Sequence, residues 1–320
     1  MIEVQNLTKV YGGKTAVEDV SFKIRNGRIY GLLGPNGAGK STTMNIIAGC
    51  LSPTEGTVLI NGYDVCDQPL EAKRQIGYLP EQPPLFTDMT PAEYLTFVAE
   101  AKGVSDEIID RQVKEAMAVT DLVSVKNRLI RNLSKGYRQR VGIAQAILGS
   151  PDIIILDEPT VGLDPKQLAD IRALIRKLGE KLTVIVSSHI LSEISELCDH
   201  VIILSEGHVV ADDDMAELEA RMNPETTLRM TVKADEAGAR AVLKSIEGVN
   251  TVTKLSENET EGTVTLRVTT TTEADLRDEI FFAMAERRYA VLSTETVEQS
   301  LEEIFLSLTA KKSKSKEVDD

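Results

Sequence analysis

Cysteine is scarce in this chain. The three cysteines, Cys50, Cys66 and Cys198, stand far apart and form no C-x-x-C pair. This spacing implies neither a disulfide framework nor a cysteine-based zinc site, and it fits a protein that works in a reducing cytosol.

Long apolar runs are also missing. No window approaches 18 consecutive apolar residues, and the first four residues show neither the basic region nor the apolar stretch of a secretory signal. We therefore expect any role at a membrane to depend on a partner protein.

Positive charge is in deficit. Lys and Arg number 36 against 50 Asp and Glu, which gives a formal net charge of −14. A nucleic-acid surface needs clustered cations, so this balance argues against DNA or RNA as a partner, as does an aromatic content of only 4%. A length of 320 residues leaves room for two domains.

What the chain does contain is a complete G-x-x-x-x-G-K-[ST] segment. Its residues, with the threonine that follows, are Gly34, Pro35, Asn36, Gly37, Ala38, Gly39, Lys40, Ser41 and Thr42. Glycines let successive N–H groups point inward as an anion nest, and the helix expected after the loop adds its N-terminal donors. Lys40 is expected to reach the β- and γ-phosphates, and the Ser41 hydroxyl to ligate Mg²⁺. The segment predicts binding of a nucleoside triphosphate.

A second acidic segment follows an apolar strand. Residues 153–156 are Ile-Ile-Ile-Leu, and Asp157 and Glu158 come next. Open α/β sheets bind ligands at the carboxyl ends of their strands, so these side chains are expected beside the triphosphate. Asp157 can hold Mg²⁺ through water, and Glu158 can polarise an attacking water. The simpler interpretation is a strand that ends in surface acids.

Hydrophobic periodicity predicts an α/β core. Up to about residue 80 we expect one helix, after Lys40, among strands at 2–11, 20–24, 29–33, 57–60 and 74–79. A helical insertion begins at Thr90 and includes 108–119. Then helices at 137–148, 166–178 and 191–197 alternate with strands at 153–156, 183–186 and 201–204, which indicates a parallel sheet with covered faces.

The pattern changes near residues 221–224. Apolar and polar residues then alternate at 228–233 and 264–269, with helices expected at 236–246 and 273–286 and further strands at 249–255 and 289–295. The order β-α-β-β-α-β is ferredoxin-like. We expect domains at 1–222, with a helical subdomain at about 88–150, and at 223–310, including a helix at 300–308. Residues 311–320 are expected to form a charged, disordered tail.

The segment Leu133-Ser134-Lys135-Gly136-Tyr137-Arg138-Gln139-Arg140 resembles the signature of ATP-binding cassette (ABC) ATPases. The order of phosphate loop, signature, Asp-Glu strand, Gly162-Leu163-Asp164-Pro165 and His189 is also similar to that family over about residues 1–220. The resemblance implies an ABC-type P-loop fold with an antiparallel β subdomain and a helical subdomain. The C-terminal module is similar to that of exporter-type subunits, including gliding-motility and multidrug ATPases.

The resemblance also implies a division of roles. ATP, with Mg²⁺, lies between the phosphate loop of one subunit and Ser134 and Gly136 of another, in a head-to-tail homodimer or heterodimer. Asp164 communicates across that interface, His189 contacts the γ-phosphate, and Tyr11 stacks on adenine. We expect the remaining histidines, His200 and His208, to lie at the surface.

This sequence departs from the family pattern in two places. The signature has Lys135 where glycine is usual and Tyr137 where glutamine is usual, which places a cation and a bulky ring near the partner's nucleotide. In the Q-loop, the family's nucleotide- and Mg²⁺-binding glutamine aligns with Glu81 or with Gln82, one place later. The sequence leaves that choice open.

The leading hypothesis is the ATP-hydrolysing subunit of a membrane transporter, held at the cytoplasmic face of the membrane by a separate permease. An accessory role for the C-terminal module, regulatory or dimer-stabilising, accompanies it. The alternatives are a soluble ABC ATPase that acts on nucleic acid or ribosomes, and a nucleotide-binding regulatory module without activity. The long coiled-coil insertions, zinc modules and paired cassettes typical of the first alternative are missing from this sequence, and intact Lys40, Asp157, Glu158 and His189 argue against the second.

Overall fold

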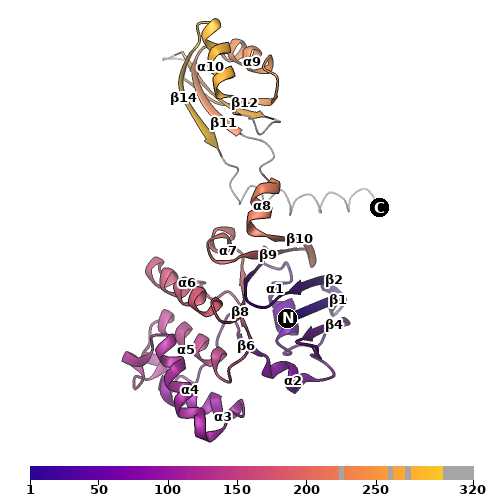
Figure 1. Ribbon diagram of the computed structural model, residues 1–320, viewed down its shortest axis with the longest axis vertical. Helices are drawn as coiled ribbons and strands as arrows, with labels where there is room; N and C mark the ends of the chain where they lie inside the picture. The colour runs from indigo at the N-terminus through magenta and orange to yellow at the C-terminus, as the bar shows by residue number, and fades with distance from the viewer. Residues whose placement is uncertain (223–226, 259–261, 271–274, 298–320) are drawn as a thin grey trace. The chain divides into compact units, whose positions relative to one another are not determined.

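The computed structural model describes residues 1–222, 227–258, 262–270 and 275–297. The chain divides into two compact units, Met1–Met215 and Ala216–Asp320 (Figure 1). The helix expected at 300–308 and the tail at 311–320 lie outside the described residues. Each unit has its own sheets and core, and each is described separately.

Unit 1 begins with a four-stranded antiparallel sheet. Its strands, in the order β2-β1-β4-β5, are β2 (Lys14–Ile24), β1 (Ile2–Tyr11), β4 (Glu55–Ile60) and β5 (Tyr63–Asp64). Alternate residues such as Ile2, Val4 and Val58 are buried, so one face of this sheet belongs to the core. The strand expected at 2–11 is confirmed residue for residue.

The central sheet of unit 1 has six strands in the order β10-β9-β3-β8-β7-β6. Their bounds are β10 (His208–Asp214), β9 (His200–Ser205), β3 (Ile29–Leu33), β8 (Thr183–Ser188), β7 (Ile153–Leu156) and β6 (Ile76–Leu79). All pair in parallel except β10 with β9. Every residue of β3, β7 and β8 is buried, as expected for a sheet with both faces covered.

Helix α1 (Lys40–Ile47) lies between the two sheets of unit 1. Its Met44, Ile46 and Ile47 share one core cluster with residues of the antiparallel sheet and with Leu32 and Ile155 of the central sheet. The first helical turn, which follows the glycine-rich loop, is thereby fixed against the carboxyl end of β3. Two further helices follow central strands along the chain, α6 (Pro165–Gly179) after β7 and α7 (Leu191–Leu197) after β8.

The helical insertion has a core of its own. It contains α3 (Pro91–Ala101), α4 (Asp106–Val119), α5 (Lys135–Ile147) and two short 3-10 turns, Val123–Val125 and Ile130–Asn132. Figure 1 shows α3, α4 and α5 gathered together, apart from β1, β2 and β4. Thr90 and Glu93 form a reciprocal capping box at the start of α3, which confirms the expected helix start.

Four local expectations were wrong. Helix α2 (Pro69–Arg74) occupies a region expected to hold only turns and strands, and β6 starts at Ile76 instead of Arg74. Strand β10 extends the central sheet beyond β9, which was expected to close it. His200 is partly buried instead of lying at the surface, because its Nδ1 and Nε2 contact Asp214 and Asp212 of β10 at 2.7 and 2.6 Å. Aspartate has a low β-propensity, but the pairing of Asp212 and Asp214 with His200 stabilises β10.

Helix α8 (Met215–Met222) leads out of unit 1. The rest of unit 2 follows in the order β11 (Thr227–Lys233), α9 (Glu236–Lys244), β12 (Val249–Asn258), β13 (Thr263–Thr270), α10 (Arg277–Glu286) and β14 (Ala290–Val297). The four strands pair antiparallel in the order β12-β13-β11-β14. Leu228, Met230 and Val232 are buried with Leu243 and Ile280 of the two helices, which confirms the predicted alternation in β11.

Candidate functional site

The glycine-rich loop connects β3 to α1 at the carboxyl edge of the central sheet. Gly39 caps α1 with φ 102° and lies close to the Ala16 carbonyl oxygen, so a Cβ there would be 2.8 Å from that atom. A Cβ on Gly34 would lie 2.4 Å from the Leu204 carbonyl oxygen. Side chains at these two positions are therefore excluded by backbone contacts, and the path of the loop requires glycine there.

Lys40 is the buried cation of the loop. Its Nζ donates to the carbonyl oxygens of Gly34 and Pro35 at 2.7 and 3.3 Å. The same Nζ lies 3.5 Å from Oε1 of Glu158, whose side chain is also buried. The lysine is thus held across its own loop by groups that phosphate oxygens can replace.

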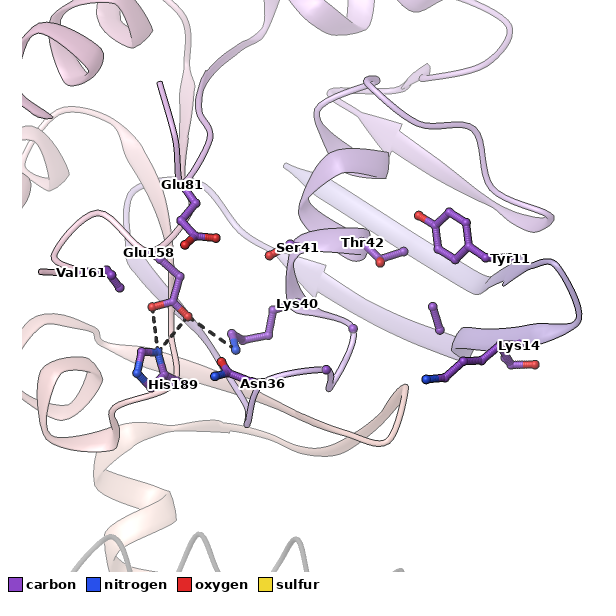
Figure 2. A pocket seen from close by; sticks show the side chains of 14 residues that line it. Tyr11, Lys14, Asn36, Lys40, Ser41, Thr42, Glu81, Glu158, Val161 and His189 are labelled. Atoms are coloured by element: carbon purple, nitrogen blue, oxygen red, sulfur yellow. Dashed lines mark hydrogen bonds and ion pairs between the residues drawn. The ribbon is translucent and has the colours of Figure 1, made fainter. Parts of the chain in front are cut away.

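Glu158 lies between Lys40 and His189. The two oxygens of its carboxylate are 3.0 and 3.1 Å from Nδ1 of His189, as the dashed lines in Figure 2 mark. Its backbone has φ 47°, a conformation that costs a non-glycine residue about 1–2 kcal/mol. The N–H of Glu158 donates to Oγ of Ser187 at 2.8 Å, and this bond helps to hold the strained residue in place.

Asp157 is the next carboxylate, buried at the end of β7. Oγ of Ser187 donates to its Oδ1 at 2.5 Å, so one hydroxyl of β8 contacts both members of the Asp-Glu pair. Carboxylate and hydroxyl oxygens are the ligands that Mg²⁺ prefers. Asp157 follows β7, and the Ser41 hydroxyl at the start of α1 follows β3, so groups of this kind come from two strands on either side of β8.

A cavity of about 550 Å³ opens beside Lys40, Glu158 and His189, and its volume is typical of small-ligand sites. Its lining includes several predicted site residues, namely Tyr11, Asn36, Gly37, Gly39, Lys40, Ser41, Thr42, Glu81, Glu158 and His189. Figure 2 shows Tyr11 on the far side of α1 from Glu158. Nζ of Lys9 lies 5.3 Å from the centre of the Tyr11 ring, a cation–π contact that was not predicted.

Glu81 and Gln82, the two candidates for the Q-loop role, differ in whether they line the cavity. Glu81 lines the cavity, and Figure 2 shows its carboxylate on the same side as Ser41 and Glu158. Gln82 is exposed and is not among the lining residues. Glu81 is therefore the candidate that borders the cavity, and the roles of both residues toward nucleotide and Mg²⁺ stay predictions.

Eight predicted site residues are not among those that line this cavity, namely Gly34, Pro35, Ala38, Gln82, Asp157, Ser134, Gly136 and Asp164. The last three belong to the starts of α5 and α6. Ser134 caps α5 by accepting from the Tyr137 N–H at 3.4 Å, and Asp164 caps α6 by accepting from the Gln167 N–H at 2.9 Å. Gly136 packs so closely against Gln167 that a Cβ would lie 2.8 Å from its side chain. The first turns of α5 and α6 are thus in contact with each other, away from the phosphate loop of the same chain.

Several residues of the site were not expected from the sequence. Ser187 and Ser188 end an apolar strand, and Thr160 and Glu193 carry no motif that marks them. All four side chains are buried and hydrogen-bonded around the Asp157-Glu158 and His189 segments. The sequence contains one signal for these residues: Ser187 and Ser188 are polar residues at the end of an otherwise apolar strand.

Comparison with known proteins places this geometry in a family. A family model described as "ABC transporter" matches residues 17–161. The linearmycin resistance ATP-binding protein LnrL of Bacillus subtilis (strain 168) is 30% identical over 312 residues, which span 97% of this chain and 99% of LnrL. The bacitracin transport ATP-binding protein BcrA of Bacillus licheniformis is 37% identical over 223 residues, covering 69% of this chain and 72% of BcrA.

Solved structures agree with these relatives. An ATP-binding subunit of an ABC transporter is 33% identical, with a TM-score of 0.63 over 69% of this chain and 92% of its own. A dimeric ATP-binding cassette in a post-hydrolysis state, bound to ADP and Pi, is 31% identical, with a TM-score of 0.61 over 67% of this chain and 99% of its own. The phosphate loop, the Asp157-Glu158 pair and His189 thus belong to an ABC cassette, and the chain is a member of the ABC transporter family of ATP-binding proteins.

Proposed function

We propose that this chain binds Mg²⁺–ATP in the cavity at Lys40 and hydrolyses it to drive a membrane transporter. One observation carries the proposal, namely the fixed position of the Glu158 carboxylate between Lys40 and His189. Hydrolysis needs a base beside the terminal phosphate, a cation on that phosphate and a group that orients the attacking water. These three side chains are of the required types and meet at one end of the cavity.

The mechanism follows from the contacts of each residue. Phosphate oxygens replace the Gly34 and Pro35 carbonyls as partners of Lys40, since a charge-assisted bond to phosphate is the stronger one. Glu158 is then released from Lys40 and accepts a proton from water, while His189 keeps the carboxylate oriented through Nδ1. Ser41, Asp157 and Glu81 are the oxygen donors for Mg²⁺, which neutralises charge on the phosphates when bound.

A head-to-tail dimer completes the site in this proposal. The signature residues Ser134 and Gly136 lie at the N-terminus of α5 and outside their own cavity, which suits contact with nucleotide held by another copy. Asp164, at the start of the neighbouring α6, is placed to move with them. A dimeric cassette among the similar structures supports this assembly.

Transport is supported by the relatives and by one surface. Relatives are named for linearmycin resistance and for bacitracin and lantibiotic transport. Phe86 and Phe97 are 50% and 41% exposed, and their ring centres lie 5.3 Å apart with the planes tilted by 49°. The buried Tyr94 ring meets Phe86 edge to face. This aromatic surface near the Q-loop is where we propose that a permease docks. None of the described helices is long and apolar enough to cross a membrane.

The C-terminal module is proposed to be a ferredoxin-like accessory domain with a regulatory or dimer-stabilising role. Its element order and the strand order β12-β13-β11-β14 support the fold assignment. Removal of residues 225–320 tests the role. Unchanged ATPase activity, dimer formation and permease binding after the deletion would eliminate it.

Phosphate release by the purified chain with Mg²⁺–ATP, compared with Lys40→Ala, tests the catalytic part of the proposal. Co-purification from membranes tests the transport part, with the integral protein identified by mass spectrometry. Phe97→Asp is expected to lose that integral protein and to keep basal ATP hydrolysis. Retention of the same protein by Phe97→Asp would refute docking at the aromatic surface.

A further inference from the structure

Glu193 is a buried carboxylate that the mechanism above does not use. It lies in α7, four residues after His189, and is only 8% exposed. Its Oε2 accepts two hydrogen bonds, from Oγ1 of Thr160 at 2.7 Å and from Oγ of Ser188 at 3.1 Å. A single oxygen atom therefore joins two segments that are far apart in the sequence.

Those two segments carry the reacting groups. Thr160 follows Glu158 by two residues, and Ser188 directly precedes His189. Ser188 Oγ also accepts from the N–H of Ile190 at 3.0 Å, which fixes the turn that carries His189 from β8 into α7. Movement of Glu193 would thus release both sides of the contact between Glu158 and His189.

The other oxygen of Glu193, Oε1, has a distant charged partner. Nη2 of Arg172, in α6, lies 3.9 Å from Oε1, and Arg172 pairs more closely with Glu196, whose side chain is 56% exposed. Burial of a carboxylate without close charge pairing is costly, so a residue with only a packing role would be apolar here. The two hydrogen bonds that Oε2 accepts from Thr160 and Ser188 explain why a carboxylate is buried here.

We infer that Glu193 is a positioning residue for hydrolysis, which holds Glu158 and His189 at contact distance through Thr160 and Ser188. The inference rests on the proposed ATPase function and extends it to a residue that does not line the cavity. A carbonyl oxygen in the place of Oε2 is sufficient for this role, because both hydroxyls donate to the same atom.

The kinetic experiment compares Glu193→Ala, Glu193→Gln and, as a matched control in the same helix, Glu196→Gln. We expect Glu193→Ala to lower kcat about 10- to 100-fold, since displacement of a reacting group by about 1 Å can cost that much. KM for ATP should change less than about threefold, because the phosphate loop is untouched. Glu193→Gln should restore kcat to within about threefold of wild type, and Glu196→Gln should match wild type.

A second readout does not depend on turnover. The chain has three histidines, so the ring proton signals of His189 are assignable by NMR with a His189→Gln variant. Without nucleotide, Glu193→Ala should shift the His189 signals, and Glu193→Gln should leave them near their wild-type positions. Absence of hydrolysis by the wild-type chain would refute the proposed function, whereas this measurement would still test Glu193.

Three results would overturn the inference. They are wild-type kcat in Glu193→Ala, equal impairment of Glu193→Gln and Glu193→Ala, and unshifted His189 signals in a folded Glu193→Ala. If Glu193→Ala does not fold, Thr160→Val and Ser188→Ala each remove one donor and keep the carboxylate. Each is then expected to lower kcat at least about threefold with KM unchanged, and wild-type rates in both would contradict the role.

Discussion

Glu158→Gln separates nucleotide binding from hydrolysis. Glutamine keeps the volume of the side chain and an oxygen near Nδ1 of His189, but it cannot accept the proton of the attacking water. Loss of general-base help costs about 10²- to 10⁴-fold in rate, which corresponds to about 3–5 kcal/mol of barrier. We therefore expect kcat to fall by about a thousandfold.

ATP binding should survive the same change. The Lys40 Nζ lies 3.5 Å from the Glu158 carboxylate, and at an effective dielectric of about 20 this attraction is of order 5 kcal/mol. The phosphates of ATP compete with the Glu158 carboxylate for Lys40. The neutral glutamine therefore removes a competitor for Lys40 and also a negative charge that repels the phosphates. We expect the affinity for ATP to be equal to or higher than that of wild type, and the dimer to accumulate with ATP bound.

Phosphate release gives kcat, calorimetry with Mg²⁺–ATP gives the affinity, and size-exclusion chromatography with and without ATP reports the dimer. Glu81→Gln is a useful comparison, because it removes a carboxylate that lines the same cavity without contact to His189 in Figure 2. Turnover of Glu158→Gln within about threefold of wild type would refute the assignment of Glu158 as the base.

Lys40→Ala should weaken ATP affinity about 10-fold or more by calorimetry, because the buried cation of the loop is lost, and unchanged affinity would contradict its role. Tyr11→Ala should weaken ATP binding about 2- to 10-fold, with Tyr11→Phe near wild type, because the aromatic face supplies the contact; equal affinity of all three would refute stacking. Hydrogen bonds to Asp212 and then Asp214 raise the pKa of His200 above its ordinary value of about 6.5. Its charged form therefore stabilises the fold below pH of about 6.5, and this contribution is lost as pH rises through the raised pKa. Thermal unfolding from about pH 6 to 8.5 should show this loss in wild type and not in His200→Gln; parallel curves would contradict it.

Much of the fold could be predicted because strong periodicity and local motifs agree. Continuous apolar runs predicted the buried strands β3 and β7, and the Thr90 cap predicted the start of α3. The start of α2 has no capping side chain, and the helix contains one buried residue, Ala72, so it carries almost no periodic signal. Strand β10 was missed because its three consecutive aspartates disfavour a strand, and the contacts of Asp212 and Asp214 with His200 are not visible in the local sequence.

The site residues also differ in how far local sequence predicts them. Gly34 to Thr42 and Asp157-Glu158 form contiguous motifs, so they could be predicted as site residues from local sequence. The register of a loop is not encoded in that way, and only the structure shows that Glu81, and not Gln82, lines the cavity. Glu193 resembles any acid on an amphipathic helix, since its partners come from two other segments.

The central claim is that each ATP site combines the phosphate loop of one copy with the signature of another. Mixing Lys40→Ala with Ser134→Arg tests it most directly, with different tags to verify that mixed dimers form. Each variant alone should be inactive. A mixed dimer pairs one intact phosphate loop with one intact signature, so an equimolar mixture should regain about a quarter of the wild-type ATPase rate. No recovery in verified mixed dimers would contradict the account.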